Sequence, residues 1–245
     1  MDRMIYLSMA GAKANFAQQE VLTLARLLAN VSTTGFRAEL HALRAVPVRG
    51  DGASTRVYSL ETTVGYDESA GTITPTNRPL DVAVMGKSWM AVQGLDGTEA
   101  YSRAGHLMTD NQGTLVTAEG LQVLGDGGPI TIPVGTEPSI APDGTVSARA
   151  RNGTSQNVGR VKLVTPETKL QRGEDGLFRA ADGAQLPLDE TARLQDGALE
   201  GSNVNPIETT VQMIASQRQY ETQMRLMQTA EQNEKSAAQL LSVNG

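Results

Sequence analysis

The stretch that follows Pro206 constrains the fold more than any other part of the chain. It contains no further proline, and no glycine until the terminal Gly245. Gln, Glu, Met, Ala and Leu dominate it, and these residues favour helices. Asn205 can cap the first free amides, and proline suits the first helical position. The sequence therefore predicts one helix from Ile207 to about Ser242, roughly 54 Å long at 1.5 Å per residue.

This predicted helix carries apolar residues on two sides, whereas a helix on the surface of a globular domain has one apolar stripe. Successive residues of a helix are rotated by about 100°. One side of this helix therefore holds Ile207, Val211 and Ile214, and the roughly opposite side holds Met213, Tyr220, Met224 and Met227. Between the two sides lie Leu226, Ala230, Ala237 and Leu240. Two interpretations stay open. The helix is either buried inside a single domain or packed between neighbours in a bundle or polymer.

Residues 2–29 predict a second helix, because they contain no proline and Gly11 is their one glycine. Its apolar stripe consists of Ile5, Met9, Ala12, Phe16 and Leu27, widened by Leu24, Leu28 and Val31. The stretch from Asn30 to Gly35 ends the helix. Antiparallel pairing of the two terminal helices would bury one stripe of each, and burial of one Leu or Ile side chain is worth about 1.5–3 kcal/mol.

The middle of the chain has the composition of a β protein. Alternating runs that predict strands are Leu80–Val84, Thr114–Thr117, Ile130–Val134 and Gly159–Val164, and Val57–Val64 is β-like in composition. Asp-Gly pairs at 96–97, 126–127, 143–144, 175–176, 182–183 and 196–197 suit the positive φ values of tight turns. Arg49–Thr55 reads as a loop and Arg149–Gln156 as a mobile loop.

We therefore predict an α+β protein in which long N- and C-terminal helices pair as a two-helix stave around an inserted all-β antiparallel domain. The predicted parts are an N-terminal helical segment (1–35), an extended connector (36–79), the β domain (80–198) and a C-terminal helical segment (199–245).

Composition and charge exclude several functions. The net charge of −6 and the pI near 5.0 disfavour electrostatic binding to nucleic acid or to an acidic membrane. No apolar run is long enough for a transmembrane helix, and we expect no secretory signal. The absence of cysteine excludes disulfides. The two histidines, His41 and His106, are too few for a histidine triad of metal ligands, and no glycine-rich loop opens a helix. We expect no metal, no cofactor and no enzymatic activity.

Two further hypotheses remain from the residues alone. One is a carbohydrate- or surface-binding β module with helical oligomerisation ends, which would need a concave polar and aromatic patch on the β domain, although aromatics are only 4% of the chain. The other is a β-rich hydrolase, which would need a pair of clustered carboxylates in a cleft.

Three segments carry a resemblance to a known family. They are Leu28–Arg37, then Arg78–Val84 with Trp89 and Tyr101–Gly105, and finally Leu199–Pro206. In this order they resemble the bacterial flagellar rod and hook proteins. The motif positions are Asn30, Ser32, Thr33, Gly35, Phe36, Ser202, Asn203 and Pro206. Within the family, the chain length and the segments Phe36–Leu40, Gly127–Pro133 and Gly176–Phe178 are similar to proximal rod subunits, with distal rod subunits as the alternative.

The resemblance implies a structural subunit that polymerises helically into the drive shaft of the flagellar basal body and transmits torque from motor to hook. It implies export without a cleaved signal peptide, no membrane insertion, and other rod subunits, copies of itself and surrounding ring proteins as partners. We expect subunit packing at Ile5, Met9, Phe16, Leu24, Leu27, Val31, Ile207, Val211, Ile214, Tyr220, Met224, Met227 and Leu240.

Overall fold

The computed structural model describes residues 2–47 and 57–243. Within these ranges, the structure does not describe the side chains of residues 2–8, 41, 43, 45–47, 57–61, 63, 238 and 240–243. The predicted loop Arg49–Thr55 and the side chains of Ile5, His41 and Leu240 therefore lie outside the described residues.

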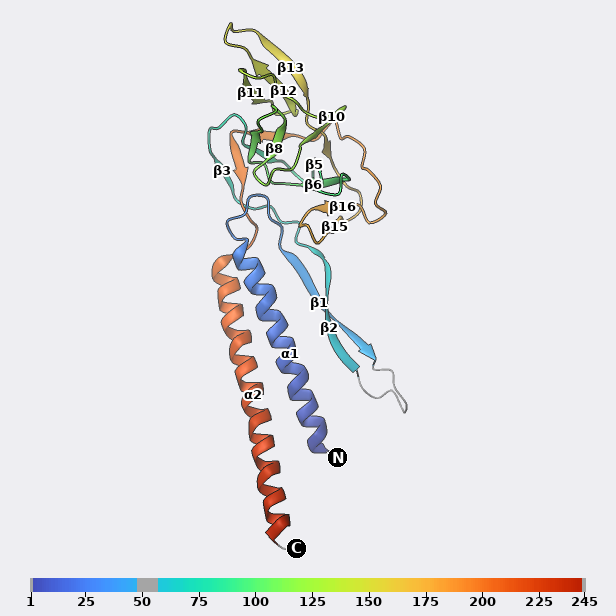
Figure 1. The fold of residues 1–245 in the computed structure, drawn as a ribbon, viewed down its shortest axis with the longest axis vertical. Helices are drawn as coiled ribbons and strands as arrows, with labels where there is room; N and C mark the ends of the chain where they lie inside the picture. The colour runs from blue at the N-terminus through green and yellow to red at the C-terminus, as the bar shows by residue number, and fades with distance from the viewer. Residues whose placement is uncertain (1, 48–56, 244–245) are drawn as a thin grey trace. The chain divides into compact units, whose positions relative to one another are not determined.

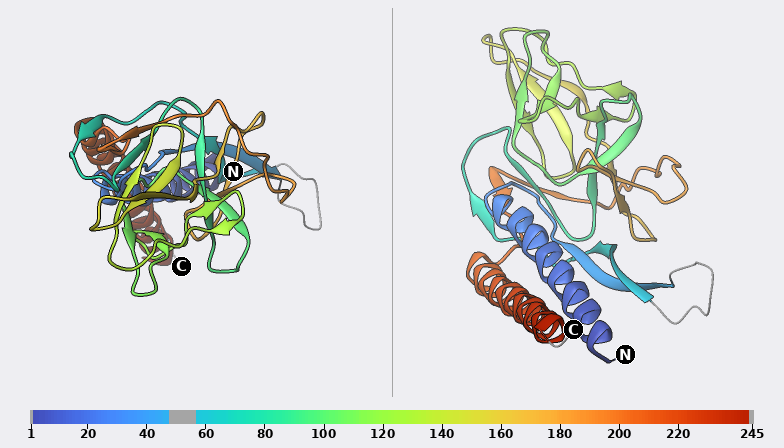
Figure 2. Two further views of the ribbon diagram at one scale, coloured as in Figure 1. Left: turned by 90° about the horizontal axis from the view of Figure 1, so that it is seen from above. Right: turned by 60° about the horizontal axis from the view of Figure 1, so that its bottom comes forward.

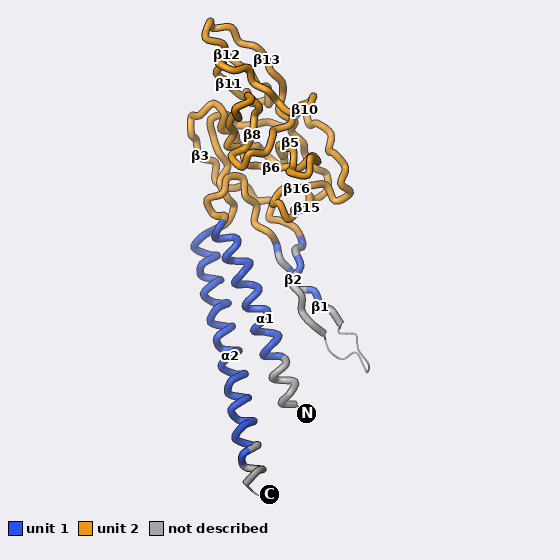
Figure 3. The backbone as a smooth tube through the Cα atoms, viewed as in Figure 1, with its two compact units in different colours: residues 1–29, 40–64, 205–245 blue, residues 30–39, 65–204 orange. Residues whose placement is uncertain are grey.

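The chain forms two compact units (Figure 3). Unit 1 contains residues 1–29, 40–64 and 205–245, and unit 2 contains residues 30–39 and 65–204. This division differs from the predicted one, because it groups residues 40–64 with the two helices and residues 65–79 with the β region. Each unit is described by itself.

Unit 1 is built on two long helices, α1 (Asp2–Ala29, 28 residues) and α2 (Pro206–Val243, 38 residues). They lie side by side and run in opposite directions (Figures 1 and 2). Asn205 caps α2, since its Oδ1 accepts hydrogen bonds from the amides of Ile207 at 3.1 Å and Glu208 at 3.4 Å. The two predicted terminal helices are confirmed, and with the antiparallel strands below they make the protein α+β.

Among the described side chains of the two helices, most of the buried ones are small. On α1 the buried positions are Ala14, Ala17 and Leu24, which recur at spacings of three and seven residues. On α2 the buried positions are Thr209 and Ser216. Such spacing places residues on one face of a helix, and their small size lets the two backbones approach closely. The predicted stripe of α1 therefore contains the buried Leu24 but not the buried Ala14 and Ala17.

Unit 1 also contains most of two described strands, β1 (Glu39–Pro47) and β2 (Val57–Tyr66), which form a two-stranded sheet. The segment predicted as an extended connector thus contains paired β structure as well as β3 (Ile73–Pro75). The first residue of β1 and the last two of β2 belong to unit 2.

Unit 2 consists of short antiparallel strands. They are β3, β4 (Val82–Val84), β5 (Trp89–Gln93), β6 (Glu99–Ser102), β7 (Leu107–Thr109), β8 (Leu115–Thr117), β9 (Leu124–Gly125), β10 (Gly128–Pro129), β11 (Glu137–Ile140), β12 (Thr145–Arg149), β13 (Ser155–Arg160), β14 (Leu163–Val164), β15 (Gln171–Arg172), β16 (Phe178–Arg179), β17 (Leu194–Asp196) and β18 (Ala198–Glu200). The largest sheet has the order β14-β5-β6-β16-β15, and β11-β12-β13 form a second sheet. The remaining strands pair as β10-β9, β17-β4, β18-β3 and β7-β8.

Two clusters of apolar side chains form the core of unit 2. The larger one is aliphatic and includes Val82, Val92 and Val123, each fully buried. The smaller one is aromatic: the rings of Trp89 and Phe178 lie 4.5 Å apart, and Tyr66 meets both edge-on. Four of the nine aromatic residues of the chain, Tyr66, Trp89, Tyr101 and Phe178, belong to this cluster, and Trp89, Tyr101 and Phe178 lie on strands of the five-stranded sheet.

The structure refines three details of the β prediction. Residues 130–134 form no continuous strand, but Thr131 pairs with Thr114 in an isolated antiparallel bridge, and Ile130 and Ile132 are buried. The segment Arg149–Gln156 contains the turn that joins β12 to β13, in which the Ala150 amide donates to Thr154 O at 2.9 Å, and its mobility stays a prediction. Five of the six Asp-Gly pairs have a glycine with positive φ, but at 126–127 the positive φ falls on Gly128 instead.

Candidate functional site

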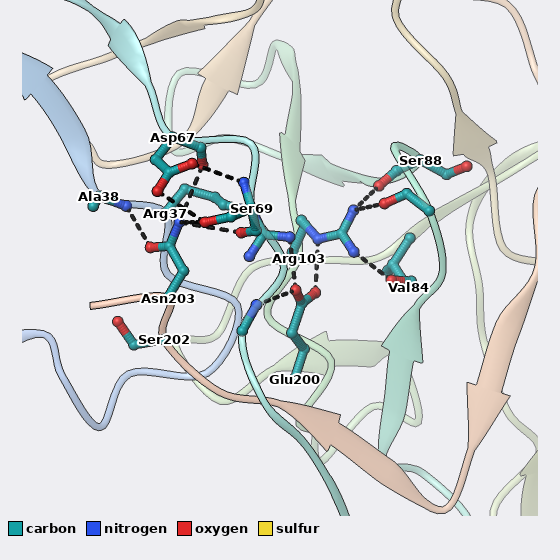
Figure 4. A network of polar contacts seen from close by, with 12 residues as sticks. Arg37, Ala38, Asp67, Ser69, Val84, Ser88, Arg103, Glu200, Ser202 and Asn203 are labelled. Carbon is teal, nitrogen blue, oxygen red and sulfur yellow. Dashed lines mark hydrogen bonds and ion pairs between the residues drawn. The ribbon is translucent and has the colours of Figure 1, made fainter. Parts of the chain in front are cut away.

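The most constrained polar site in unit 2 is centred on the carboxylate of Glu200, at the end of β18. Arg37 Nη2 donates to Glu200 Oε1 at 2.6 Å, and Arg103 Nε donates to Oε2 at 2.7 Å (Figure 4). The amide of Gly71 adds a third hydrogen bond, at 3.1 Å. All three charged side chains are buried. We call Arg37, Arg103, Glu200 and the neighbouring Asn203 the Glu200 junction.

Arg103 extends the junction into the backbone of unit 2. Its Nη1 donates to the carbonyls of Ser88 at 2.5 Å and Gly86 at 3.1 Å, and its Nη2 donates to Val84 O. Burial lowers the pKa of the Arg103 guanidinium, and the charge of Glu200 opposes that shift. Arginine nevertheless stays protonated in proteins, so Arg103 is a fixed cation that ties the segment after β4 to β18.

Asn203 holds the chain on the other side of the junction. Its Oδ1 accepts the Ala38 amide at 2.8 Å, and its Nδ2 donates to the carbonyls of Asp67 at 3.1 Å and Ser69 at 3.2 Å. Asp67 in turn accepts hydrogen bonds from the amide and hydroxyl of Ser69, which lower the pKa of its carboxyl. One asparagine thus ties two separate segments of unit 2 to the segment that precedes α2.

Gly35 lets the first segment pass closely beside Arg103. Its φ is +68°, and a Cβ at this position would lie 2.3 Å from the carbonyl carbon of Arg103. The Gly35 amide donates to Glu200 O at 2.8 Å, and the Asn203 amide donates to Phe36 O at 3.3 Å. Only glycine combines this conformation with this approach.

The junction therefore joins the three segments that carried the family resemblance in the sequence. Arg37 follows Phe36 in the first segment, Arg103 lies within Tyr101–Gly105, and Glu200 and Asn203 belong to the third. Arg37, Arg103 and Glu200 were not among the predicted site residues. Their signal was present in the sequence, since each is the charged residue of a recognised motif, but nothing local showed that they meet.

The other motif positions lie around this junction. Thr33 Oγ1 donates to Asn30 Oδ1 at 3.2 Å, Ser32 is exposed, and Phe36 is buried under the guanidinium of Arg172, 4.6 Å from the ring centre. The Val204 amide donates to Ser202 Oγ at 3.2 Å. Pro206 is the first residue of α2.

The predicted subunit-packing residues divide into two groups by exposure. Leu24 is buried, and Phe16, Leu27, Val31, Tyr220, Met224 and Met227 are partly buried. Met9, Ile207, Val211 and Ile214 are exposed, by 51%, 76%, 62% and 45%. Ile207, Val211 and Ile214 lie about 180° around α2 from the buried Thr209 and Ser216, so they form an apolar surface that α1 does not cover. We call these three residues the outer face of α2.

His106 takes part in an ion-pair cluster rather than a metal site. Its Nδ1 lies 3.0 Å from Asp81 Oδ1, which also accepts Arg78 Nη1 at 2.9 Å. Among the residues described here, no group of His, Cys, Asp and Glu is arranged to hold a metal ion. In the same ranges, neither helix is long and apolar enough to cross a membrane.

Comparison with known proteins identifies the family. The chain is 45% identical to the flagellar basal-body rod protein FlgF of Salmonella typhimurium over the full length of both chains. The chain belongs to the flagellar basal-body rod protein family. The FlgF protein of Escherichia coli is 44% identical to this rod protein over full length, and the FlgG protein of Bacillus subtilis is 32% identical over 95% of this chain and 96% of its own.

Two family models match parts of this rod protein. The model described as flagellar basal body rod FlgEFG protein C-terminal covers residues 195–240, and the model described as flagellar hook protein FlgE/F/G D1 domain covers residues 83–148. The first spans Glu200, Asn203 and the outer face of α2. These relatives are rod and hook proteins, which at the level of the family supports the expectation that the chain is not an enzyme.

Proposed function

We propose that the chain is a structural subunit of the proximal rod of the bacterial flagellum, which polymerises helically with copies of itself and with adjacent rod subunits. The 45% identity to FlgF, against 32% to FlgG, favours the proximal over the distal rod. The same matches leave a surface-binding β module or a hydrolase as weaker hypotheses. The rod lies in the basal body and spans the periplasm, and the flagellar export apparatus delivers its subunits there.

The observation that carries the mechanism is the outer face of α2. In the proposed assembly α1 and α2 form one antiparallel stave, held by the small residues at their contact. Ile207, Val211 and Ile214 remain in water in the single chain. Burial of each such side chain is worth about 1.5–3 kcal/mol, so neighbouring subunits that cover this face gain free energy. Contacts between neighbours then let the shaft resist twisting.

The test introduces a charge on the outer face. We expect Val211→Asp to abolish rod assembly, because a carboxylate buried between subunits is costly. The isolated subunit should keep its stability within about 0.5 kcal/mol, as exposed substitutions usually do. Motility and electron microscopy of purified basal bodies would measure assembly, and thermal unfolding would measure the subunit.

The matched control is Gln219→Asp, which introduces the same charge at an exposed position about 100° from the outer face. We expect rods of normal length and stability from this variant. Normal rods from Val211→Asp would contradict the proposed role of the outer face. Met224→Asp is a less selective variant, because Met224 is partly buried and its substitution should disturb helix pairing as well as assembly.

A further inference from the structure

A pocket of about 240 Å³ lies beside the Glu200 junction, wholly within unit 2. Arg37 and Arg103 form part of its wall, and Lys87 and Lys169 also line it. Its acidic lining residues are Glu68 and Glu167. With Glu200, which binds both arginines from behind the wall, four cations face three carboxylates and leave an excess of one positive charge in a chain whose net charge is −6. The pocket is therefore an electropositive site in an acidic protein.

The buried part of the wall has more positive than negative charge. Arg37 and Arg103 are 2% and 3% exposed, and both use the single carboxylate of Glu200. The Nη1 of Arg37 is buried and has no hydrogen-bond partner among the described residues. Buried cations are costly unless they are paired and hydrogen-bonded. A further anion in the pocket would therefore be favoured electrostatically.

In the exposed part of the pocket wall, the carboxylate of Glu68 lies between the ammonium groups of Lys87 and Lys169. Lys87 Nζ lies 3.2 Å from Glu68 Oε2, and Lys169 Nζ lies 3.7 Å from Glu68 Oε1. The lysine side chains are 80% and 60% exposed. Glu68 thus partly neutralises the cations that a bound anion would meet, and it acts as an internal competitor for that anion.

Aromatic groups complete the pocket. Trp89 and Tyr66 line it, and Pro166 adds further apolar surface. An inorganic anion would leave this apolar wall unused, whereas the methylene groups of an organic acid can pack against it. We propose that the pocket binds a carboxylate on a short aliphatic stem. The carboxylate would come either from a small organic acid or from an Asp or Glu side chain of a neighbouring copy of this chain.

The test uses Trp89, the only tryptophan of the chain, as a reporter inside the pocket. The fluorescence of the full chain is titrated with propionate at constant ionic strength, and with propionamide as the neutral isostere. We expect a saturable change with propionate and none with propionamide. A linear response, an equal response to the two compounds, or tighter binding of phosphate than of propionate would overturn the proposal.

Two variants with opposite expected effects sharpen the test. Lys87→Gln removes a cation and should weaken propionate binding about two- to fivefold, whereas Glu68→Gln removes the competitor and should strengthen it by a similar factor. The matched controls are Lys13→Gln and Glu119→Gln, which make the same changes at exposed positions that do not line the pocket. Equal affinities in Lys87→Gln, Glu68→Gln and the controls would also overturn the proposal.

A second measurement distinguishes the two sources of the carboxylate. Self-association of the chain is followed by sedimentation with and without saturating propionate. If a neighbouring copy supplies the carboxylate, propionate competes with it and lowers association, and Lys87→Gln lowers association as well. If a free organic acid is the ligand, association does not change while the Trp89 response persists.

Discussion

The two compact units bury different kinds of side chain. Unit 2 has a large, almost completely buried aliphatic core, although Leu95 and Val134 are exposed at its surface. The described side chains of the unit 1 helices that are buried are few, Ala14, Ala17, Leu24, Thr209 and Ser216, and Leu22, Ile207 and Val211 are mostly exposed. A residue that is already buried gains nothing from a partner, while an exposed apolar face does. The stability of unit 2 therefore comes largely from its own core, whereas the row of exposed apolar residues on α2 gives unit 1 a surface that assembly can cover.

The largest expected effect comes from breaking the Glu200 junction. Glu200→Gln leaves two buried guanidinium groups without their counter-charge, and removing one partner of a buried ion pair costs about 3–5 kcal/mol. Chemical denaturation followed by Trp89 fluorescence would measure the loss in unit 2. Glu119→Gln, at an exposed position, should change stability by less than about 0.5 kcal/mol. Equal values for the two variants would show that the junction contributes little.

The next largest expected effect on stability comes from the close approach of the Gly35 and Arg103 backbones. Gly35→Ala should destabilise unit 2 by about 2–4 kcal/mol for two reasons. The alanine would be strained in the left-handed backbone conformation, and its Cβ would clash with the Arg103 backbone. Gly183→Ala is the matched control: its φ of +70° is nearly the same, but no atom lies within 4 Å of the added carbon. We expect about 1–2 kcal/mol for the control, from strain alone. The difference between the two unfolding free energies isolates the clash.

The corresponding change in unit 1 is overpacking of the helix contact. Ala17 is fully buried on α1, so Ala17→Leu should cost about 1–3 kcal/mol by forcing the helices apart. Ala12→Leu, on the exposed side of the same helix, should be nearly neutral. Thermal unfolding followed by far-ultraviolet circular dichroism would compare them. A neutral Ala17→Leu would mean that the two helices are not tightly packed.

The smallest expected effect is a pH dependence of the free energy of unfolding of unit 2. Burial, together with hydrogen bonding to Glu99, raises the pKa of Tyr101 to about 12. Because the folded pKa lies above the unfolded value of about 10, this stabilisation is complete below pH 10 and is lost as pH rises toward 12. We expect a loss of about 1–2 kcal/mol over that window.

Tyr101→Phe provides the comparison for that titration. The variant loses the hydrogen bond that the Leu186 amide donates to the tyrosine hydroxyl at 2.7 Å, so it should be about 1 kcal/mol less stable at neutral pH. Its unfolding free energy should then converge with that of the unsubstituted chain as pH approaches 12. Curves that stay parallel would contradict the assigned titration.

The difference between the units also explains what the sequence predicts well. The helices were predictable because capping and propensity are local: Asn205, Pro206 and the absence of glycine act within a few residues. The face of α1 was harder, since Met9 and Phe16 dominate an apolar pattern while Ala14 and Ala17 form the buried contact. Small residues are important on this face because α2 lies close to it. The sequence of α1 alone does not show which face α2 approaches.

The Glu200 junction could not be derived from local sequence. Arg37 and Glu200 are 163 positions apart, and Arg103 and Glu200 are 97 apart. They pair because the fold places β18 next to the segment that precedes β1. No periodicity in the sequence predicts that these two segments are neighbours. The resemblance named the segments, yet only the fold shows that Arg37, Arg103 and Glu200 share one site.

The long separation of Arg37 from Glu200 has a consequence for the order of folding. A nascent chain that is still too short to contain Glu200 carries both arginines but not their carboxylate. Contacts between distant positions also require the closure of a large loop, which slows their formation. Unit 2 should therefore reach its final state only after nearly the whole chain is available, so that completeness of the chain itself governs the last folding step.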